Sequence, residues 1–461
     1  MKMLPTALTT FLLFLKVWWW LILPFILVPL FLRAWLWWRQ HEVWQGKQEY
    51  ILLELIPPPE ILQPISAMEH VFSALWGIYS GIRGISHFRK RWLIGRRLNH
   101  FCFEIVSFGP HPHFFVRLLK QHRDTFESAM YSQFPDMEIV EAKDYLKYIT
   151  WNVPNKDWQM YGMDMILVKP DVYPIKTYRM FFEERPEMIK EEKRIDPLPT
   201  LLEGMSTLKE NEEMLWVQMR IEPVSSHDDN YVERGKRLVD KLVFRTKKAK
   251  SLITTLLTGA SGEEEEKSFI PPEMKLTPRE KEIVKAIEDK ISKPAFRCNI
   301  RTVYLSKPEI FRFGRRALAE QFFNTFATRD LNAIKKWSKT KTRVWHFFID
   351  RRLYVRRRRI FQRYLLGETP LYPLNGGTYI LNTEELATLF HLPLAVGRVG
   401  TLLPRVRVRK VEAPPELEEV EREYQFPIKP APKITYPKRE APPELPTENS
   451  SSDKTINKNE P

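Results

Sequence analysis

Apolar residues recur at every second position in several short stretches of the chain. Residues 101–105 (FCFEI) show this period, and residues 214–222 (MLWVQMRIE) follow it over a longer run. Side chains of a β-strand point alternately to its two faces, so the period predicts strands with a buried face. Apolar residues three and four positions apart replace this pattern over residues 68–82 and 126–134, which predicts amphipathic helices there.

These elements predict an α+β fold built in two rounds. In the first, residues 48–150, strands and helices follow the order β-α-β-β-α-β, which is the split βαβ arrangement of ferredoxin-like folds. The second round, residues 151–404, repeats the order less evenly, because a helical insertion at residues 225–294 interrupts its hairpin. Residues 379–381 are the candidate for its closing strand. We therefore expect two tandem ferredoxin-like modules.

A long apolar stretch, residues 17–38, predicts a transmembrane helix within an N-terminal anchor of residues 1–47. Tryptophans cluster at both of its ends, where indole side chains favour the headgroup level of a bilayer. Trp19 and Trp37 would lie roughly 27 Å apart along a helix, close to the ~30 Å of the hydrocarbon core. A slight excess of basic residues after the span, and only two cysteines, favour a single-pass cell-membrane protein with most of the chain in the cytoplasm.

The C-terminal stretch has a different composition. Residues 405–461 are rich in proline, glutamate and lysine and poor in apolar residues, which predicts a disordered Pro-rich tail. The motif EAPPEL occurs twice in it, at residues 412–417 and 440–445. An extended polyproline-type linker and a duplicated docking motif are both compatible with this repeat.

The chain carries a formal net charge of +15, which favours an anionic partner. The charge is concentrated in residues 335–363, where twelve lysines and arginines occur with a single acidic residue, Asp350. Six aromatic residues are interleaved with them, a mixture that contacts phosphates while stacking on bases or reaching lipid headgroups. The candidate contacts to nucleic acid or anionic lipid are Arg351, Arg352, Arg356, Arg357, Arg358, Arg359 and Arg363. A solvated surface or an acidic partner protein is the competing interpretation.

Two details of the basic residues qualify this prediction. A second basic run, residues 88–97 (FRKRWLIGRR), follows the first predicted helix. Within residues 356–359, four consecutive arginines cannot share one face of a helix or strand, because successive side chains point in different directions. We therefore expect sequence-tolerant binding rather than a surface that reads a specific base sequence.

The sequence contains no complete motif for nucleotide binding or hydrolysis. The nearest approach to a phosphate loop, residues 262–268 (GEEEEKS), places four carboxylates where backbone N–H groups would have to hold phosphate. His111 and His113 flank a turn, and they could hold a metal only with a third ligand from elsewhere. Cys102 and Cys298 lie on predicted strands and are interpreted as small packed thiols. We expect no catalytic residue, no cofactor and no metal.

Several longer strings of residues occur in an order that resembles a known family. They are AMEHVFSALWGIY (67–79), FEIVSFG with HFF (103–115), YSQFPDMEI (131–139), YPIKTY (173–178), DPL with LWVQ (196–218) and LNTEELATLFHLP (381–393). Together, over residues 50–417, they resemble the membrane-anchored N-terminal region of bacterial conjugative DNA-transfer ATPases, the type IV coupling-protein-like group with HerA/FtsK-type motors. Similar chains continue into a motor domain with a phosphate loop. The resemblance carries no nucleotide-binding residue onto this chain, and it implies a separately encoded motor.

Two functions follow as expectations. The first is a non-catalytic, membrane-anchored subunit of a type IV secretion or conjugative DNA-transfer-like machine. It would form an oligomer and act as an adaptor between the inner membrane and a separately encoded motor ATPase. The alternative is a stand-alone, membrane-tethered nucleic-acid-binding protein, in which residues 335–363 are the site and no motor is required. An enzyme of unrecognised type comes third.

Overall fold

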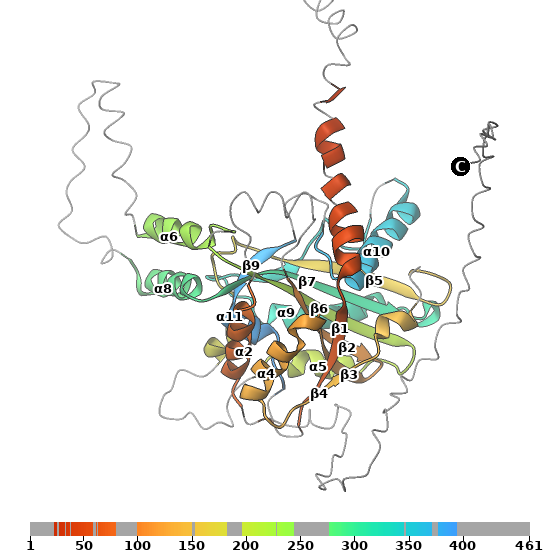
Figure 1. Cartoon of the computed structure of the whole chain (residues 1–461), viewed down its shortest axis with the longest axis horizontal. Coiled ribbons are helices and arrows are strands. Elements are labelled where there is room, and N and C mark those ends of the chain that lie inside the picture. Colours follow the sequence, from red (N-terminus) through yellow and green to blue (C-terminus); the bar gives the residue numbers. More distant parts are fainter. Residues whose placement is uncertain are drawn as a thin grey trace, which may run out of the picture.

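The chain folds as an α+β protein dominated by one nine-stranded antiparallel sheet (Figure 1). The computed structural model describes residues 23–24, 27–32, 34–36, 38–58, 61, 63–79, 99–149, 153–181, 196–226, 228–243, 276–344, 347–370 and 377–393. The predicted tail at 405–461, the basic run at 88–97 and the phosphate-loop-like stretch at 262–268 lie outside these residues.

The first half of the sheet has four strands, and two helices connect them within the described residues. The strands are β1 (Tyr50–Ile56), β2 (Phe101–Phe108), β3 (His111–Leu119) and β4 (Glu138–Glu141), and the helices are α2 (Ser66–Trp76) and α4 (Arg123–Gln133). The strand order is β4-β1-β3-β2. Because β3 lies between β1 and β2, and α2 connects these two strands, this half has the pattern of a split βαβ unit.

The second half repeats this order, β6-β7-β5-β8. Its elements are β5 (Gln159–Leu167), α5 (Pro199–Ser206), β6 (Glu213–Val224), β7 (Ala295–Ser306), α9 (Ala317–Asn324) and β8 (Ile334–Lys336). Residues 379–381 do not close this half. They belong to β9 (Tyr379–Asn382), which pairs with the beginning of β7, while β8 takes the closing position beside β5.

The two halves form one continuous sheet rather than two separate sheets. Strand β2 of the first half pairs with β6 of the second, from Phe101 opposite Ile221 to Phe108 opposite Met214. An open sheet edge presents unpaired N–H and C=O groups, and joining the two edges pairs these groups. The prediction of two separate modules in tandem is therefore wrong, because β2 and β6 join the two halves into a single sheet.

Alternate side chains of the strands face two different cores. On one face, residues such as Phe103 and Val217 pack beneath α2, α4, α5, α9 and α11 (Thr383–Leu389). On the opposite face, Val106 and Trp216 pack with Tyr364 of α10 (Ile349–Leu366). Figure 1 shows α10 on the side of the sheet away from α2, α4 and α5. Short 3-10 turns occur at Gln45–Lys47, Lys120–His122, Tyr145–Tyr148, Tyr178–Phe181, Pro308–Ile310 and Phe313–Arg316.

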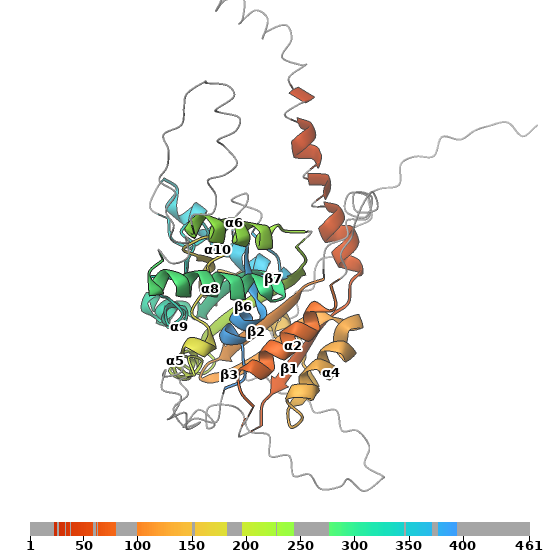
Figure 2. The ribbon, with the colours of Figure 1, turned by 90° about the vertical axis from the view of Figure 1, so that its left-hand side faces the viewer.

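In the described part of the insertion between β6 and β7, helices α6 (Tyr231–Leu242) and α8 (Pro278–Ser292) lie side by side (Figures 1 and 2). The side chain of Thr277 accepts a hydrogen bond from the backbone N–H of Glu280, and this capping box begins α8. Val239 and Ile287 lie in the small core between the helices. A Cβ at Gly235 would lie 2.5 Å from Ile291, so only glycine allows this close approach.

The string LNTEELATLFHLP (381–393) forms the end of β9 and α11, and its polar residues hold neighbouring elements together. Asn382 and Glu385 form a capping box at the start of α11. Glu385 also accepts from Lys290 of α8, with 2.9 Å between Oε2 and Nζ, and both side chains are buried. His391 Nε2 lies 2.7 Å from Asp196 Oδ1. The polar residues of this string therefore stabilise the fold.

The N-terminal segment corrects the predicted membrane anchor. Within the predicted span of residues 17–38, the structure describes helical residues at 23–24, 27–32, 34–36 and 38, and a π-helical segment at Arg39–Trp44 follows. A helix needs about 20 consecutive, predominantly apolar residues to cross a bilayer. No helix in the described part of the chain is both long and apolar enough. The predictions of a transmembrane helix and of a single-pass cell-membrane protein are therefore wrong.

Candidate functional site

Helix α10 carries most of the basic segment and is fixed to the sheet by an apolar stripe. Ile360, Phe361 and Tyr364 are buried in the core on this face, where the ring of Tyr364 lies 5.2 Å from that of Trp216. A Cβ at Gly162 of β5 would lie 2.7 Å from Ile360 Cγ2, so glycine at this position lets the helix approach the strand closely. The apolar stripe thereby determines which side of α10 faces away from the sheet.

A groove of about 690 Å³ lies beside α10. One wall is a stripe of the helix whose residues recur every three or four positions, and Lys339 and Thr340 contribute the other wall. Arg356 ties the two walls together, since its Nη1 donates to the carbonyl oxygens of Lys341 at 3.3 Å and Arg343 at 3.0 Å. The charged lining consists of Lys339, Arg351, Arg352, Arg356, Arg359 and Arg363.

The groove is strongly electropositive, because none of the residues that line it is acidic. Within the described ranges, no carboxylate lies within ion-pair distance of Lys339, Arg351, Arg352 or Arg359. Burial lowers the pKa of Arg356, and the positive charge of Arg352 lowers it further. A bound anion would relieve this repulsion between the cations. Lys339 was not among the predicted contacts, although it belongs to the basic segment.

Arg363 differs from the other arginines of the groove because a buried carboxylate faces it. Its Nη1 lies 3.2 Å from Asp164 Oδ2, and Asp164 Oδ1 accepts from Arg301 Nε at 2.9 Å. Burial lowers the pKa of Arg363 to about 10, although Asp164 acts in the opposite direction. Burial also raises the pKa of Asp164, but the charges of Arg301 and Arg363 outweigh it and hold this pKa below its ordinary value.

Five of the seven predicted arginines line the groove, and the other two do not. Arg357 contacts β5, where its Nη1 donates to Gln159 Oε1 at 2.8 Å, and burial lowers its pKa. Arg358 lies next to Tyr354, one turn earlier in the helix, with 3.5 Å between Nη1 and the hydroxyl oxygen. This division follows from helical geometry, because four consecutive residues cannot occupy one face.

The aromatic residues of the basic segment include both buried and exposed side chains, and Trp345 lies outside the described residues. Trp337 and Phe361 are buried and belong to the interior. Phe347 and Phe348 are 87% and 81% exposed, and Phe348 lines the groove. The φ angle of Phe348 is 56°, a left-handed conformation that bulky residues rarely adopt. Phe348 was one of the six interleaved aromatic residues in the sequence but was not among the predicted contacts, although its spacing of four residues from Arg352 could have indicated a shared helical face.

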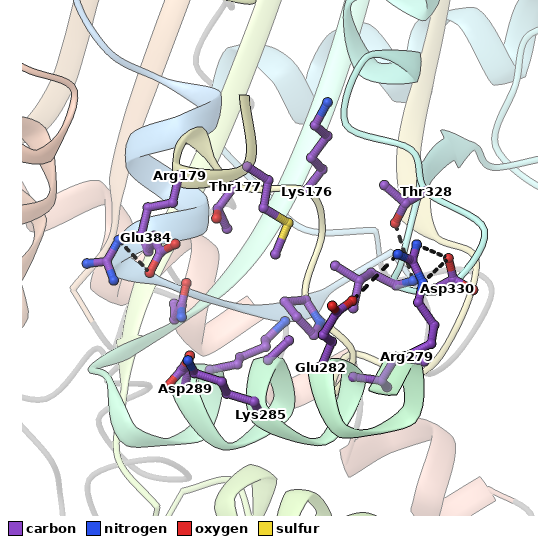
Figure 3. Close-up of a pocket in the computed structure, with 17 residues that line it drawn as sticks. Lys176, Thr177, Arg179, Arg279, Glu282, Lys285, Asp289, Thr328, Asp330 and Glu384 are labelled. Atoms are coloured by element: carbon purple, nitrogen blue, oxygen red, sulfur yellow. Dashed lines mark hydrogen bonds and ion pairs between the residues drawn. The ribbon is translucent and has the colours of Figure 1, made fainter. Parts of the chain in front are cut away.

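A second groove, of about 570 Å³, lies between α8 and residues 174–180 (Figure 3). Here cations and carboxylates neutralise one another. Arg279 is ion-paired with Asp330, and Arg179 Nε lies 3.7 Å from a carboxylate oxygen of Glu384 (Figure 3). Because these carboxylates offset the positive charges, this groove is less suited to an anion than the groove beside α10.

The two histidines and two cysteines considered in the sequence form neither a metal site nor a reactive thiol within the described part of the chain. His113 is buried, with its Nδ1 2.7 Å from Glu54 Oε1, and His111 is exposed at the turn. No group of three or more metal-ligating side chains occurs among the residues that the structure describes. Both cysteines are buried and free, and burial raises the pKa of Cys102 to about 12 and that of Cys298 as well. Such thiols are poor nucleophiles, because the thiolate is the reactive form.

Comparison with known proteins gives a family for the chain. A family model described as a domain of unknown function (DUF8128) matches residues 79–395, which is more than half of the sequence. This range begins just after α2 and runs through α11, and it includes the whole of α10 and the groove beside it. None of the curated proteins matches the chain. The chain therefore belongs to the DUF8128 family of domains of unknown function.

Proposed function

We propose that this chain is a non-catalytic nucleic-acid-binding component of a DNA-transfer machine and works with a motor ATPase. The observation that carries the proposal is the groove beside α10, whose lining includes six cations and no carboxylate. Such a groove attracts anionic ligands. Phe348 in the same lining favours nucleic acid, since bases stack on exposed aromatic rings.

The spacing of the cations favours a polymer over an isolated anion. Arg352, Arg356, Arg359 and Arg363 follow one another at intervals of three or four residues. In a helix this interval corresponds to a rise of roughly 4.5–6 Å. A ligand that repeats its negative charge along a line can contact several of these arginines at once, whereas a single phosphate contacts only one or two.

The motor partner is inferred from the sequence. Strings such as LNTEELATLFHLP (381–393) resemble conjugative DNA-transfer ATPases, whose motor domains carry the phosphate loop. In this role the chain would bind the transferred nucleic acid, and the motor would hydrolyse ATP. We expect the chain to raise the DNA-stimulated ATPase rate of its motor, and the groove variant described next to lose that effect.

The proposal is tested by exchanging exposed groove arginines in the full-length chain. The groove variant carries Arg351→Ser, Arg352→Ser and Arg359→Ser. It leaves Arg356 in place because Arg356 is hydrogen-bonded to the backbone of residues 341–343. The control variant carries Lys236→Ser, Arg237→Ser and Lys241→Ser, which removes the same charge from exposed positions on α6. Binding of a labelled DNA oligonucleotide is measured by fluorescence anisotropy across a salt series.

Each lost phosphate contact lowers the slope of log affinity against log salt by ~0.7 for a single strand or ~0.9 for a duplex. The groove variant loses two or three such contacts and should therefore show a slope shallower by roughly 1.5 to 3, and the control variant should keep the slope of the unchanged protein. Equal slopes in all three proteins would overturn the proposal. So would lost binding to vesicles of anionic lipid with unchanged DNA binding, because the groove would then bind lipid.

A further inference from the structure

The surroundings of α10 favour a single strand over a duplex in this groove. An α-helix with its side chains is ~10–12 Å wide and by itself fills the ~12 Å major groove of B-DNA. On one side of α10, Arg356 is hydrogen-bonded to the backbone of residues 341–343. On another side, Ile360 and Phe361 pack against the sheet. The C-terminal half of α10, together with the chain segments packed against it, is therefore too wide to enter a major groove. A strand without a partner can lie in the groove itself.

Phe348 provides a second, independent indication. It lies directly before the first residue of α10, at the groove, and its side chain is 81% exposed. A bulky residue in the left-handed region is strained, and such strain persists where the surrounding structure imposes it, often at binding sites. A large ring held out from the surface in this way can stack on the face of an unpaired base. In a duplex, neighbouring base pairs already cover that face.

The remaining lining residues give little means of reading a base sequence. Besides the cations, the lining contains Phe348, Val355 and one neutral hydrogen-bonding side chain, Thr340. The hydroxyl oxygen of Thr340 already accepts from the backbone N–H of Asp164 at 3.3 Å. Contacts of guanidinium groups with phosphates, and of an aromatic ring with the face of a base, can form with any sequence.

We propose that the groove beside α10 binds single-stranded nucleic acid without sequence preference, with phosphates on Arg352, Arg356 and Arg359 and a base stacked on Phe348. This inference rests on the proposed function and specifies the form of nucleic acid that the groove takes. Bases stacked on an aromatic ring add affinity only when they are unpaired and present. The contributions of base and phosphate can therefore be separated with an oligonucleotide that has a backbone but no bases.

The experiment measures binding of the full-length chain to three probes of equal length: oligothymidylate, the same strand in a duplex, and an abasic oligonucleotide. The variants are Phe348→Leu and Phe348→Trp, and Tyr131→Leu serves as a control, because Tyr131 is an exposed aromatic residue on α4. Phe348→Leu should weaken binding of oligothymidylate roughly 5- to 150-fold and leave binding of the abasic strand unchanged. Phe348→Trp and Tyr131→Leu should bind oligothymidylate at least as tightly as the unchanged chain.

Two results would overturn the inference and leave the proposed function standing. One is a duplex bound as tightly as the single strand, with both dependent on the groove arginines. The other is unchanged affinity of Phe348→Leu for oligothymidylate while the arginine variant loses affinity. If instead the groove variant binds every probe as tightly as the unchanged chain does, the proposed function itself fails. Because Phe348 is exposed, Phe348→Leu should also retain the thermal midpoint of the unchanged chain, which establishes that it is folded.

Discussion

Replacing Asp164 with asparagine should destabilise the sheet and disturb the groove at the same time. Asp164 lies within β5 and is fully buried. Its two carboxylate oxygens face Arg301 of β7 at 2.9 Å and Arg363 of α10 at 3.2 Å. Asparagine has nearly the same shape but no charge, so Asp164→Asn leaves two guanidinium groups without their counter-charge.

The structure sets the magnitude of this loss. Removing one partner of a buried ion pair costs about 3–5 kcal/mol, because the remaining charge stays buried and uncompensated. The side chain of Arg301 is 1% exposed and that of Arg363 is 15% exposed, so water screens them only slightly. Arg301 keeps neutral hydrogen-bond acceptors on Gln218 and Asn299, which places the expected loss near the lower end, about 3 kcal/mol.

The assay is urea unfolding of the full-length chain at neutral pH, followed by tryptophan fluorescence. Asp157→Asn is the matched control, since Asp157 is exposed in the turn before β5, and its free energy of unfolding should change by no more than about 0.5 kcal/mol. A loss below about 1 kcal/mol in Asp164→Asn would refute the reasoning that this carboxylate neutralises the two arginines.

The same variant has a defined pH dependence. The pKa of Asp164 is held below its ordinary value in the folded chain, so its contribution to stability is present above the unfolded pKa of about 3.9. That contribution is lost as pH falls through the folded pKa. The difference in unfolding free energy between the unchanged chain and Asp164→Asn should therefore shrink below about pH 4, and a constant difference would contradict this linkage.

Two further predictions concern buried groups with raised pKa values. Burial raises the pKa of Cys102 to about 12 and also raises that of Cys298, so neither thiol should react with a thiol reagent at neutral pH until urea unfolds the chain. Reaction of either thiol in the folded protein would contradict their burial. Burial and the hydrogen bond to Glu213 raise the pKa of Tyr304 to about 12. The contribution of Tyr304 to stability is present below its unfolded pKa of about 10 and is lost as pH rises toward 12. In urea unfolding, Tyr304→Phe should therefore lose less stability than the unchanged chain over this pH range. Equal losses in the two proteins would count against this linkage.

Local patterns in the sequence predicted some strands well and missed others. The alternation at residues 101–105 and 214–222 marks β2 and β6, because both strands present one face to the larger core. Strand β8 has only three residues, Ile334–Lys336, two of them exposed lysines, and shows no such alternation. Its place beside β5 depends on pairing between distant parts of the chain, which a local pattern does not contain.

The predicted membrane helix rested on apolar composition and on the spacing of tryptophans. These features establish that a segment is apolar, but they do not establish one uninterrupted helix of sufficient length. Pro24 and Pro29 lie within the segment, and each removes a backbone hydrogen-bond donor. No helix among the described residues meets the requirement for crossing a membrane.

The basic segment was visible in the sequence because its charge density is local. The arginines that line the groove could be chosen only after the phase of α10 was known, and buried Ile360, Phe361 and Tyr364 set that phase. The pairing of Arg363 with Asp164 was not predictable, because it depends on how α10 packs over β5. Charge density thus indicated the segment, and tertiary packing decided the role of each arginine.

The most direct measurement is photo-cross-linking of the full-length chain to a thymine-containing single strand, with the cross-linked peptides mapped by mass spectrometry. We expect cross-links at residues 347–363, Phe348 among them, and we expect excess unlabelled strand to suppress them. Cross-links confined to other elements, such as α6 or α8, or none at saturating DNA, would contradict the claim that the groove beside α10 binds nucleic acid.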